Sequence, residues 1–255
     1  VVNEPAPLAF TSFVITDPSC YAVCDGTVNT TTAGGTAPYS YNWSGNIAGA
    51  AAPNATGVCA GVYSLILTDD NGCQIDSMNF VLTDPAPVPL TGVVVTDVLC
   101  YGGSTGVITI NAPTATQFSI DGGVTFQASN VFGGLPIGNY DVVAQDPNGC
   151  ESSSNTTVYQ PDSLYSIAPS DWFGCYGAVV VVQAFSNGGV PPYNYSWTNN
   201  VDATVVNTDM FNYTITLPAP GIDFTLAITD ANGCPAVPVT YNVSSNPPLV
   251  VVAGN

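Results

Sequence analysis

Two short phrases that each contain a cysteine recur three times along the chain. A Cys-Tyr pair is followed each time, at a similar distance, by a phrase that starts with Asp and ends in Asn-Gly-Cys. The first phrase supplies Cys20, Cys100 and Cys175, and the second supplies Cys73, Cys150 and Cys234. This regular order predicts three copies of one small unit that is closed by a cystine.

A proline-containing segment separates the copies and marks their boundaries, as in Glu4-Pro5-Ala6-Pro7 and Asp84-Pro85-Ala86-Pro87. Short linkers of this kind resist bending, so we expect consecutive units to be joined semi-rigidly. The predicted units are repeat 1 (residues 1–86), repeat 2 (87–162), repeat 3 (163–248) and the start of a further repeat (249–255).

Each repeat reads as a set of β-strands. Runs of β-branched and aromatic residues alternate with polar ones and are separated by Gly, Asn, Asp and Pro, and no long stretch has a helical period. Tyr39-Ser40-Tyr41-Asn42-Trp43 shows the period of two, and the Asn-Gly phrases are typical of hairpin turns. About seven strands in each unit predict an all-β chain of tandem immunoglobulin-like β-sandwich modules, each closed by a disulfide.

The copies also suggest a disulfide pairing when they are used as an internal alignment. Repeats 2 and 3 hold two of these cysteines each, so the simplest pairing stays inside a repeat. Cys24 and Cys59 have no counterparts in the other repeats, and this joint absence is what a bonded pair predicts. The expected bonds are Cys20–Cys73, Cys24–Cys59, Cys100–Cys150 and Cys175–Cys234.

The charge composition excludes several classes of function. The chain has 18 acidic residues and no Lys, Arg or His. Without cations there is no phosphate clamp, no nucleic-acid groove and no attraction to anionic lipid, so nucleic acid is not an expected partner. Without His or Lys there is no Ser-His-Asp triad and no Schiff base. The one class of enzyme that this composition still allows is a hydrolase with two catalytic carboxylates, and no suitable pair of acids stands out.

Eight regularly spaced cysteines favour an oxidising compartment, and we expect an extracellular, cell-surface location. The alternative of structural zinc is disfavoured because no Cys-x-x-Cys pair occurs. No apolar run approaches the length of a membrane span, so no direct membrane insertion is predicted.

The repeated phrases resemble a known family, the SprB repeat. The resemblance is carried in repeat 2 by residues 98–102, 117–123, 126–135 and 138–150, and repeats 1 and 3 look like a sister form with Gly34-Gly35…Trp43 and Gly188-Gly189…Trp197. It implies a segment of a very large surface adhesin of Bacteroidota, exported by type IX secretion and used in attachment or gliding motility. Two short matches, at Ser77 and Ser163, resemble O-glycosylation sites of the same bacteria.

Two hypotheses for binding sites are weighed against structural roles. Trp43 and Trp197 could form a sugar-stacking platform, but a core Trp packed on the cystine is the favoured interpretation. Asp17, Asp69, Asp97 and Asp146 lie close to the repeated cysteines and could converge on Ca²⁺, whereas the alternative is that they cap turns. No other cofactor is predicted.

The sequence therefore predicts a non-catalytic stalk or filament segment that carries a binding tip. Its expected partners are neighbouring repeats of the same chain and surface polysaccharide. The alternative is a carbohydrate-binding or spacer module of a secreted enzyme.

Overall fold

The computed structural model describes residues 5–45, 47, 51–167, 172–200, 205–208, 212–216 and 222–246. All of the regular structure in these residues is β-strand, and none is helix. The all-β prediction is confirmed. The chain divides into two compact units, the first made of Val1–Gly92, Ile110–Asn130 and Asp141–Ser154, and the second of Val93–Thr109, Val131–Tyr140 and Asn155–Asn255. The division into three repeats stays a prediction, and repeats 1, 2 and 3 denote residues 1–86, 87–162 and 163–248. The expected start of a further repeat at 249–255 lies outside the described residues.

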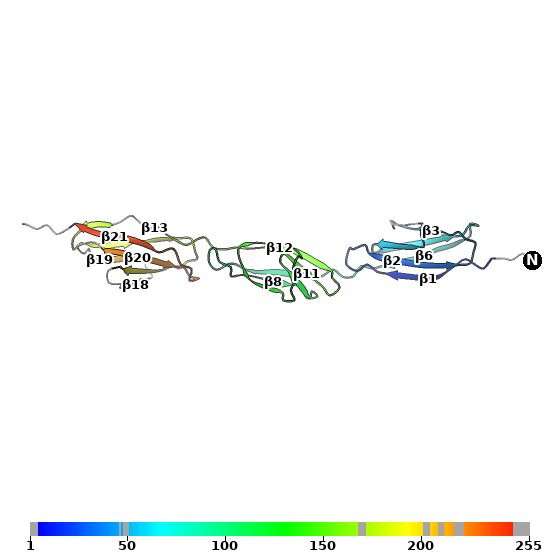
Figure 1. The fold of residues 1–255 in the computed structure, drawn as a ribbon, viewed down its shortest axis with the longest axis horizontal. Coiled ribbons are helices and arrows are strands. Elements are labelled where there is room, and N and C mark those ends of the chain that lie inside the picture. The colour runs from blue at the N-terminus through cyan, green and yellow to red at the C-terminus, as the bar shows by residue number, and fades with distance from the viewer. Residues whose placement is uncertain are drawn as a thin grey trace, which may run out of the picture. The chain divides into compact units, whose positions relative to one another are not determined.

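Repeat 1 folds into two three-stranded antiparallel sheets (Figure 1). One sheet has the order β1-β2-β4 and the other β3-β5-β6. Alternating apolar residues of both sheets, among them Val28, Trp43, Leu65 and Phe80, form one buried cluster. The strands are β1 (Ala9–Thr16), β2 (Gly26–Ala33), β3 (Ser40–Trp43), β4 (Asn54–Val58), β5 (Gly61–Thr68) and β6 (Gln74–Leu82).

Repeat 2 has the same strand order in its two sheets. One sheet has the order β10-β8-β7 and the other β12-β11-β9. The strands are β7 (Gly92–Thr96), β8 (Gly106–Asn111), β9 (Gln117–Ser119), β10 (Val131–Leu135), β11 (Gly138–Gln145) and β12 (Glu151–Val158).

Repeat 3 contains a larger five-stranded sheet with the order β14-β21-β20-β17-β18 and two smaller pairs, β15-β19 and β13-β16. In the five-stranded sheet β14 and β21 pair in parallel, and the other three neighbouring pairs are antiparallel. Trp197, Phe224 and Leu226 lie in its core. The strands are β13 (Tyr165–Ile167), β14 (Trp172–Cys175), β15 (Val179–Gln183), β16 (Phe185–Asn187), β17 (Asn194–Asn199), β18 (Val205–Thr208), β19 (Asn212–Thr216), β20 (Ile222–Thr229) and β21 (Val239–Asn246).

The distribution of strands between the sheets is that of immunoglobulin-like sandwiches. In repeats 1 and 2 the first, second and fourth strands share one sheet and the third, fifth and sixth share the other, which matches the A-B-E and C-F-G sets of that fold. A tyrosine near the start of the fifth strand donates its hydroxyl back to the main chain four residues earlier, from Tyr63 to Cys59 and from Tyr140 to Pro136. The immunoglobulin-like class is confirmed, with six described strands in each of these repeats where about seven were expected.

Candidate functional site

The cysteines pair across repeat boundaries, and this pairing defines the candidate site. Cys20 of repeat 1 is bonded to Cys150 of repeat 2, and Cys100 of repeat 2 is bonded to Cys234 of repeat 3. The predicted bonds Cys20–Cys73, Cys100–Cys150 and Cys175–Cys234 were therefore wrong. Cys24 and Cys59 are bonded to each other, as their joint absence from the other repeats indicated. Cys73 and Cys175 are exposed free thiols.

The length of one strand explains why the expected bond in repeat 1 cannot form. Cys73 directly precedes β6, whereas Thr83 directly follows it and donates its main-chain N–H and its hydroxyl to Asp17, both at 2.9 Å. The loop that carries Cys20 is therefore held at the far end of β6. Nine residues of strand span roughly 30 Å, whereas the Cα atoms of a cystine lie at most about 7 Å apart.

In the other repeats, too, the Cys-Tyr loop and the Asn-Gly-Cys turn lie at opposite ends of the last strand. Cys150 directly precedes β12, and Tyr159 directly follows this strand and donates its N–H to Asp97 at 2.8 Å. Cys175 pairs in register with Asn246 at the end of β21, whereas Cys234 lies before the beginning of that strand. The Cys-Tyr loop of a repeat thus lies where its last strand ends and the linker to the next repeat begins.

The Asn-Gly-Cys turn lies where the linker enters its repeat. In repeat 1 the main-chain N–H of Gly35 donates to Ala6 in the incoming linker at 2.7 Å, and the N–H of the next residue, Thr36, donates to Asp69 of the turn at 3.0 Å. Repeat 3 repeats both bonds, from Gly189 to Asp162 and from Val190 to Asp230. At a boundary, the Cys-Tyr loop of one repeat and the Asn-Gly-Cys turn of the next are therefore neighbours.

A carboxylate fixes each Asn-Gly-Cys turn. Oδ1 of Asp69, Asp146 and Asp230 accepts the N–H groups of the residues two and four positions later, at distances between 2.8 and 3.0 Å. The Thr36 N–H, with those of Cys73 and Asn71, lowers the pKa of Asp69 against the opposing effect of burial. For Asp230 burial raises the pKa, but the N–H groups of Val190, Cys234 and Asn232 outweigh it, and the net shift is downward.

At each boundary the incoming turn is covered by the preceding Cys-Tyr loop. The carbonyl oxygen of Leu99 accepts a hydrogen bond from Asn232 Nδ2 at 3.0 Å and lies 3.4 Å from Sγ of Cys234. The carbonyl oxygen of Ser19 lies 3.3 Å from Sγ of Cys150. Cys150 and Cys234 are only 8% and 6% exposed.

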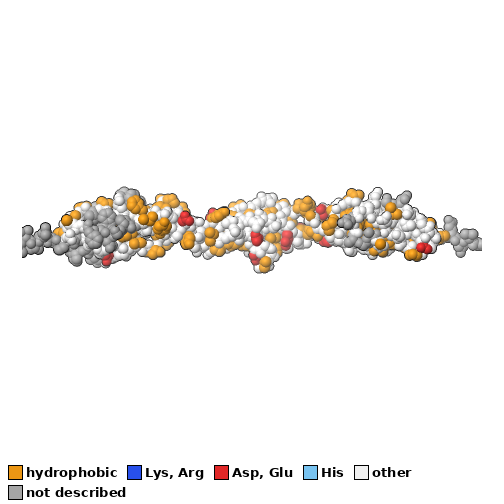
Figure 2. Space-filling view, turned by 90° about the horizontal axis from the view of Figure 1, so that it is seen from above, with side chains coloured by type: hydrophobic (Ala, Val, Ile, Leu, Met, Phe, Trp, Pro, Cys, Tyr) orange, Lys and Arg blue, Asp and Glu red, His pale blue; other side chains and the backbone are white. Residues whose placement is uncertain are grey.

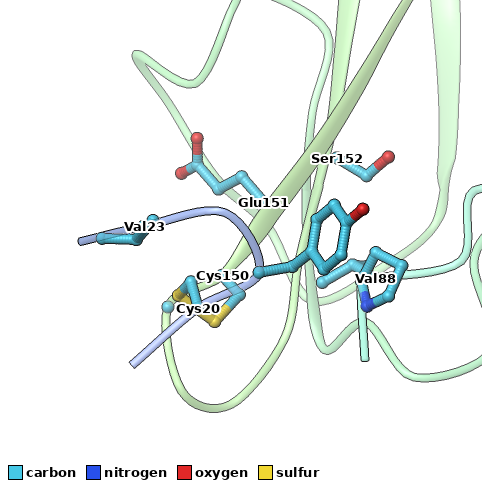
Figure 3. Close-up of a pocket in the computed structure, with 9 residues that line it drawn as sticks. Cys20, Val23, Val88, Cys150, Glu151 and Ser152 are labelled. Carbon is cyan, nitrogen blue, oxygen red and sulfur yellow. A yellow bond between two sulfur atoms is a disulfide. The ribbon is translucent and has the colours of Figure 1, made fainter. Parts of the chain in front are cut away.

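A hollow of about 480 Å³ lies beside the Cys20–Cys150 cystine. Its walls come from the Cys-Tyr loop, the linker and the start of β12, and Figure 3 shows Val23, Val88 and Glu151 around the cystine. A hollow of about 240 Å³ has the corresponding position beside Cys100–Cys234. Each is lined by the exposed tyrosine of its Cys-Tyr pair, Tyr21 or Tyr101.

The linker packs closely on a double-glycine turn of the repeat that it enters. A Cβ at Gly34 would lie 1.9 Å from the Pro7 carbonyl oxygen, and a Cβ at Gly188 would lie 2.0 Å from that of Ser163. Both glycines have φ near +75°, a region that favours glycine. Leu164, the next residue in the linker, is buried in the core of repeat 3. The boundary is therefore fixed by packing as well as by a cystine.

The two tryptophans considered for sugar stacking, Trp43 and Trp197, belong to the core, as the favoured interpretation predicted. Trp43 is 5% and Trp197 1% exposed. Trp43 donates its ring N–H to the Ala52 carbonyl oxygen and packs edge-on against Phe80. The buried clusters around both tryptophans contain no cysteine, so the expected packing on a cystine was wrong. Neither ring offers a face for sugar stacking.

Of the four aspartates suggested for Ca²⁺, Asp69 and Asp146 cap their own turns through main-chain N–H groups. Asp17 and Asp97 instead accept the N–H of Thr83 and of Tyr159, which follow the last strands of their repeats. In the part of the chain that the structure describes, His, Cys, Asp and Glu side chains form no group of three or more that could hold a metal ion. Calcium binding stays a prediction. Figure 2 shows the acidic side chains in small, separate groups on the face in view.

The suggested glycosylation sites lie in different settings. Ser163 is exposed in the linker before repeat 3, and Ser77 lies in β6, where its side chain is outside the described residues. Glycan attachment at both stays a prediction. Among the described residues no helix is long and apolar enough to cross a membrane.

The SprB repeat family model matches residues 12–47. This segment runs from β1 through the Cys20 loop to just beyond β3, so the match lies in repeat 1, whereas the most detailed resemblance was expected in repeat 2. No curated protein matches the chain. The SprB match and the disulfides together indicate an extracellular, adhesin-type module.

Several solved structures are similar at low identity. The fibronectin(III)-like modules of CbhA from Clostridium thermocellum are 12% identical, with 60% of this chain and 94% of that chain covered and a TM-score of 0.27. A structure on Dscam isoform specificity is 12% identical, with 93% and 74% covered and a TM-score of 0.30. SGBP-B of the Bacteroides ovatus mixed-linkage glucan utilization locus, in complex with a mixed-linkage heptasaccharide, is 12% identical, with 96% and 71% covered and a TM-score of 0.25. At these TM-scores the likenesses carry no information on function.

Proposed function

We propose that the chain is a non-catalytic structural segment of a large extracellular surface adhesin, in which cross-linked repeats carry a binding tip away from the cell surface. The observation that carries this proposal is the cystine at each repeat boundary. Together with the peptide linker it gives consecutive repeats two covalent connections, and two connections restrict hinge motion far more than one. A stalk needs this property, whereas an isolated binding module does not.

The finer parts of the proposal rest on the resemblance to SprB repeats. In this proposal the protein is exported by type IX secretion in a member of the Bacteroidota, is displayed on the cell surface and serves in attachment or gliding. Neighbouring repeats are the first partners, and surface polysaccharide is a further proposed partner. The rival role as a carbohydrate-binding module is weakened because Trp43 and Trp197 are buried and offer no stacking platform.

Scattering on disulfide variants tests whether the cystines restrict the boundaries. We compare the wild type with the pairs Cys20→Ser with Cys150→Ser and Cys100→Ser with Cys234→Ser by small-angle X-ray scattering. We expect a broader distribution of dimensions for each variant, because the linker alone allows bending. The pair Cys24→Ser with Cys59→Ser, which removes a cystine inside a repeat, is the control, and its melting curve must show that repeat 1 stays folded at the temperature of the scattering measurement. Equal profiles for all proteins would contradict the stalk role. A parallel series of the wild type with and without Ca²⁺ tests the calcium hypothesis, which predicts a narrower distribution of dimensions when Ca²⁺ is present.

A disulfide map checks the pairing itself. Trypsin has no site in a chain without Lys and Arg, but a protease that cuts before Asp separates the relevant cysteines. We expect the peptide that begins at Asp97 and contains Cys100 to be linked to the peptide that begins at Asp230. A link to the peptide that begins at Asp146, which contains Cys150, would instead show a bond inside repeat 2 and would contradict the proposal.

A further inference from the structure

Two cysteines of the repeated phrases, Cys73 and Cys175, are exposed and unbonded. Cys73 is the counterpart of Cys150 and Cys234, and Cys175 is the counterpart of Cys20 and Cys100. Leftover thiols in a disulfide-rich chain suggest pairing with a cysteine of another molecule.

The bonded counterparts show which partner each free thiol fits. At both boundaries the cysteine of an Asn-Gly-Cys turn is bonded to the cysteine of a Cys-Tyr loop, and never to another turn or loop of its own kind. The partner of Cys73 is by this rule a Cys-Tyr cysteine, and the partner of Cys175 is an Asn-Gly-Cys cysteine. The chain carries one free half of each kind.

Burial gives an independent indication that something covers the Cys73 turn. Cys150 and Cys234 are buried, and the residues that approach their sulfur atoms are Ser19 and Leu99 of the preceding loops. Cys73 is exposed, and among the described residues no Cys-Tyr loop is bonded to it. The exposure of the cysteine therefore depends on whether a Cys-Tyr loop lies against the turn, and not on the turn itself.

The free halves share a main-chain hydrogen bond with the bonded ones, although Cys175 is also the last residue of β14, whereas Cys20 and Cys100 lie outside the strands. The main-chain N–H of Asp69 donates to the Cys73 carbonyl oxygen at 3.0 Å, as in the turns of Cys150 and Cys234. The carbonyl oxygen of Cys175 accepts the N–H of Ala178 at 3.0 Å, and those of Cys20 and Cys100 accept the corresponding N–H groups at 3.1 and 3.0 Å. The turn that carries Cys73 and the loop that carries Cys175 therefore keep the local hydrogen bond that accompanies each bonded cysteine.

We propose that Cys73 and Cys175 are complementary halves of a further boundary cystine, each a site for covalent head-to-tail attachment to another repeat of this kind. A second copy of the chain supplies both complements, so Cys175 of one copy bonds to Cys73 of the next. The inference rests on the geometry of the two closed boundaries and does not depend on what the protein attaches to.

The reaction is an oxidation and needs a disulfide oxidant. With oxidised glutathione, the Cys73 thiolate attacks one glutathione sulfur and releases a glutathione thiolate, and the Cys175 thiolate then displaces the second glutathione from Cys73. Two protein thiols and one oxidised glutathione give one cystine and two reduced glutathiones. Both electrons pass to glutathione, and the thiol protons are taken up by the released thiolates.

A mixing experiment with two single variants tests the complementarity. Cys73→Ser keeps only the Cys175 thiol free, and Cys175→Ser keeps only that of Cys73. The two proteins are given different affinity tags, mixed in equal amounts with oxidised and reduced glutathione, and analysed by non-reducing electrophoresis and intact mass. We expect mixed dimers to exceed the two kinds of self-dimer together by about tenfold, because only the mixed pair joins a loop to a turn.

The controls separate this result from unspecific oxidation. The double variant Cys73→Ser with Cys175→Ser must stay monomeric, and equal melting temperatures must show that all variants fold. A disulfide map of the mixed dimer should contain the Cys73–Cys175 link with Cys20–Cys150 and Cys100–Cys234 unchanged. Mixed dimers and self-dimers in the ratio of random pairing would overturn the proposal, and so would the absence of dimers.

Discussion

The chain contains disulfides of two kinds, one inside a repeat and two between repeats, and they act on different parts of the structure. The Cys24–Cys59 bond joins residues only 35 positions apart. It lies beside strands β2 and β4, which are already paired with Gly26 opposite Val58. The bonds between repeats join residues 130 and 134 positions apart and connect loops that are each held by the carboxylates and main-chain bonds of their own repeat.

The difference shows that the cystines that recur along the chain do not hold the sandwich together. Repeat 2 has Ser104 and Pro136 where repeat 1 has Cys24 and Cys59, and it forms the same two sheets without that bond. The boundary cystine, in contrast, occurs at both boundaries. Apolar cores and sheet ladders are sufficient for a repeat, and the recurring cysteines serve the connection between repeats.

The largest effect that this comparison predicts is the loss of the bond inside repeat 1. We expect Cys24→Ser with Cys59→Ser to lower the free energy of unfolding of repeat 1 by about 4 kcal/mol, because the unfolded chain is no longer closed into a loop. Hydrogen exchange followed by mass spectrometry should show faster exchange of main-chain amides in β2 and β4. Amides of β20 and β21 in repeat 3 should be unchanged.

The pair Cys100→Ser with Cys234→Ser is the reverse control for this experiment. It should speed exchange around Gly102 and Asn232, at the boundary between repeats 2 and 3, and leave β2 and β4 as they are. If both pairs change the same amides, the distinction between the two kinds of bond is lost.

Much of the fold could be predicted from local sequence. Residues 39–43 alternate with a period of two because every second side chain of a strand points to the same face, and Trp43 is accordingly buried. The Asn-Gly turns also lie where they were expected, because Asp69 and its equivalents hydrogen-bond to main-chain groups within four residues. These features depend on neighbours in the chain, and an internal alignment finds them.

The pairing of the cysteines could not be obtained from the alignment alone. Alignment shows that Cys20, Cys100 and Cys175 are equivalent, but a bond inside a repeat and a bond to the next repeat give the same pattern of equivalent positions. The signal that separates them is the strand order. An A–B loop and an F–G turn lie at opposite ends of a sandwich, and the residues of β6 between Cys73 and Thr83 already separate them by the length of a strand.

A glycine variant sharpens the comparison by loosening the boundary without touching a cysteine. We expect Gly188→Ala to destabilise repeat 3 by about 3 kcal/mol, because the new Cβ meets the Ser163 carbonyl oxygen in addition to the cost of a positive φ. Gly233→Ala is the matched control. Gly233 has φ +79° and no atom within 4 Å of a new Cβ, so the cost should be only about 1 kcal/mol. Thermal unfolding measures both, and equal losses would show that the linker does not press on the Gly188 turn.

The smallest effect concerns the carboxylates that hold the cysteine-bearing turns. Hydrogen bonds lower the pKa of Asp69 in the folded state, so its contribution to stability is fully present above its unfolded pKa of about 3.9 and is lost as the pH falls through the lower folded value. We therefore expect the difference in melting temperature between the wild type and Asp69→Asn to shrink as the pH is lowered from about 6 to about 2. Asp70→Asn, at the exposed neighbouring residue, is the control and should show no comparable change.

The same experiment on Asp230→Asn tests the turn whose cysteine is bonded to the preceding repeat. Because the Cys100–Cys234 cystine and the Leu99 carbonyl oxygen also hold this turn, we expect a smaller loss than for Asp69→Asn, and an equal or larger loss would mean that the boundary bond does not support the turn.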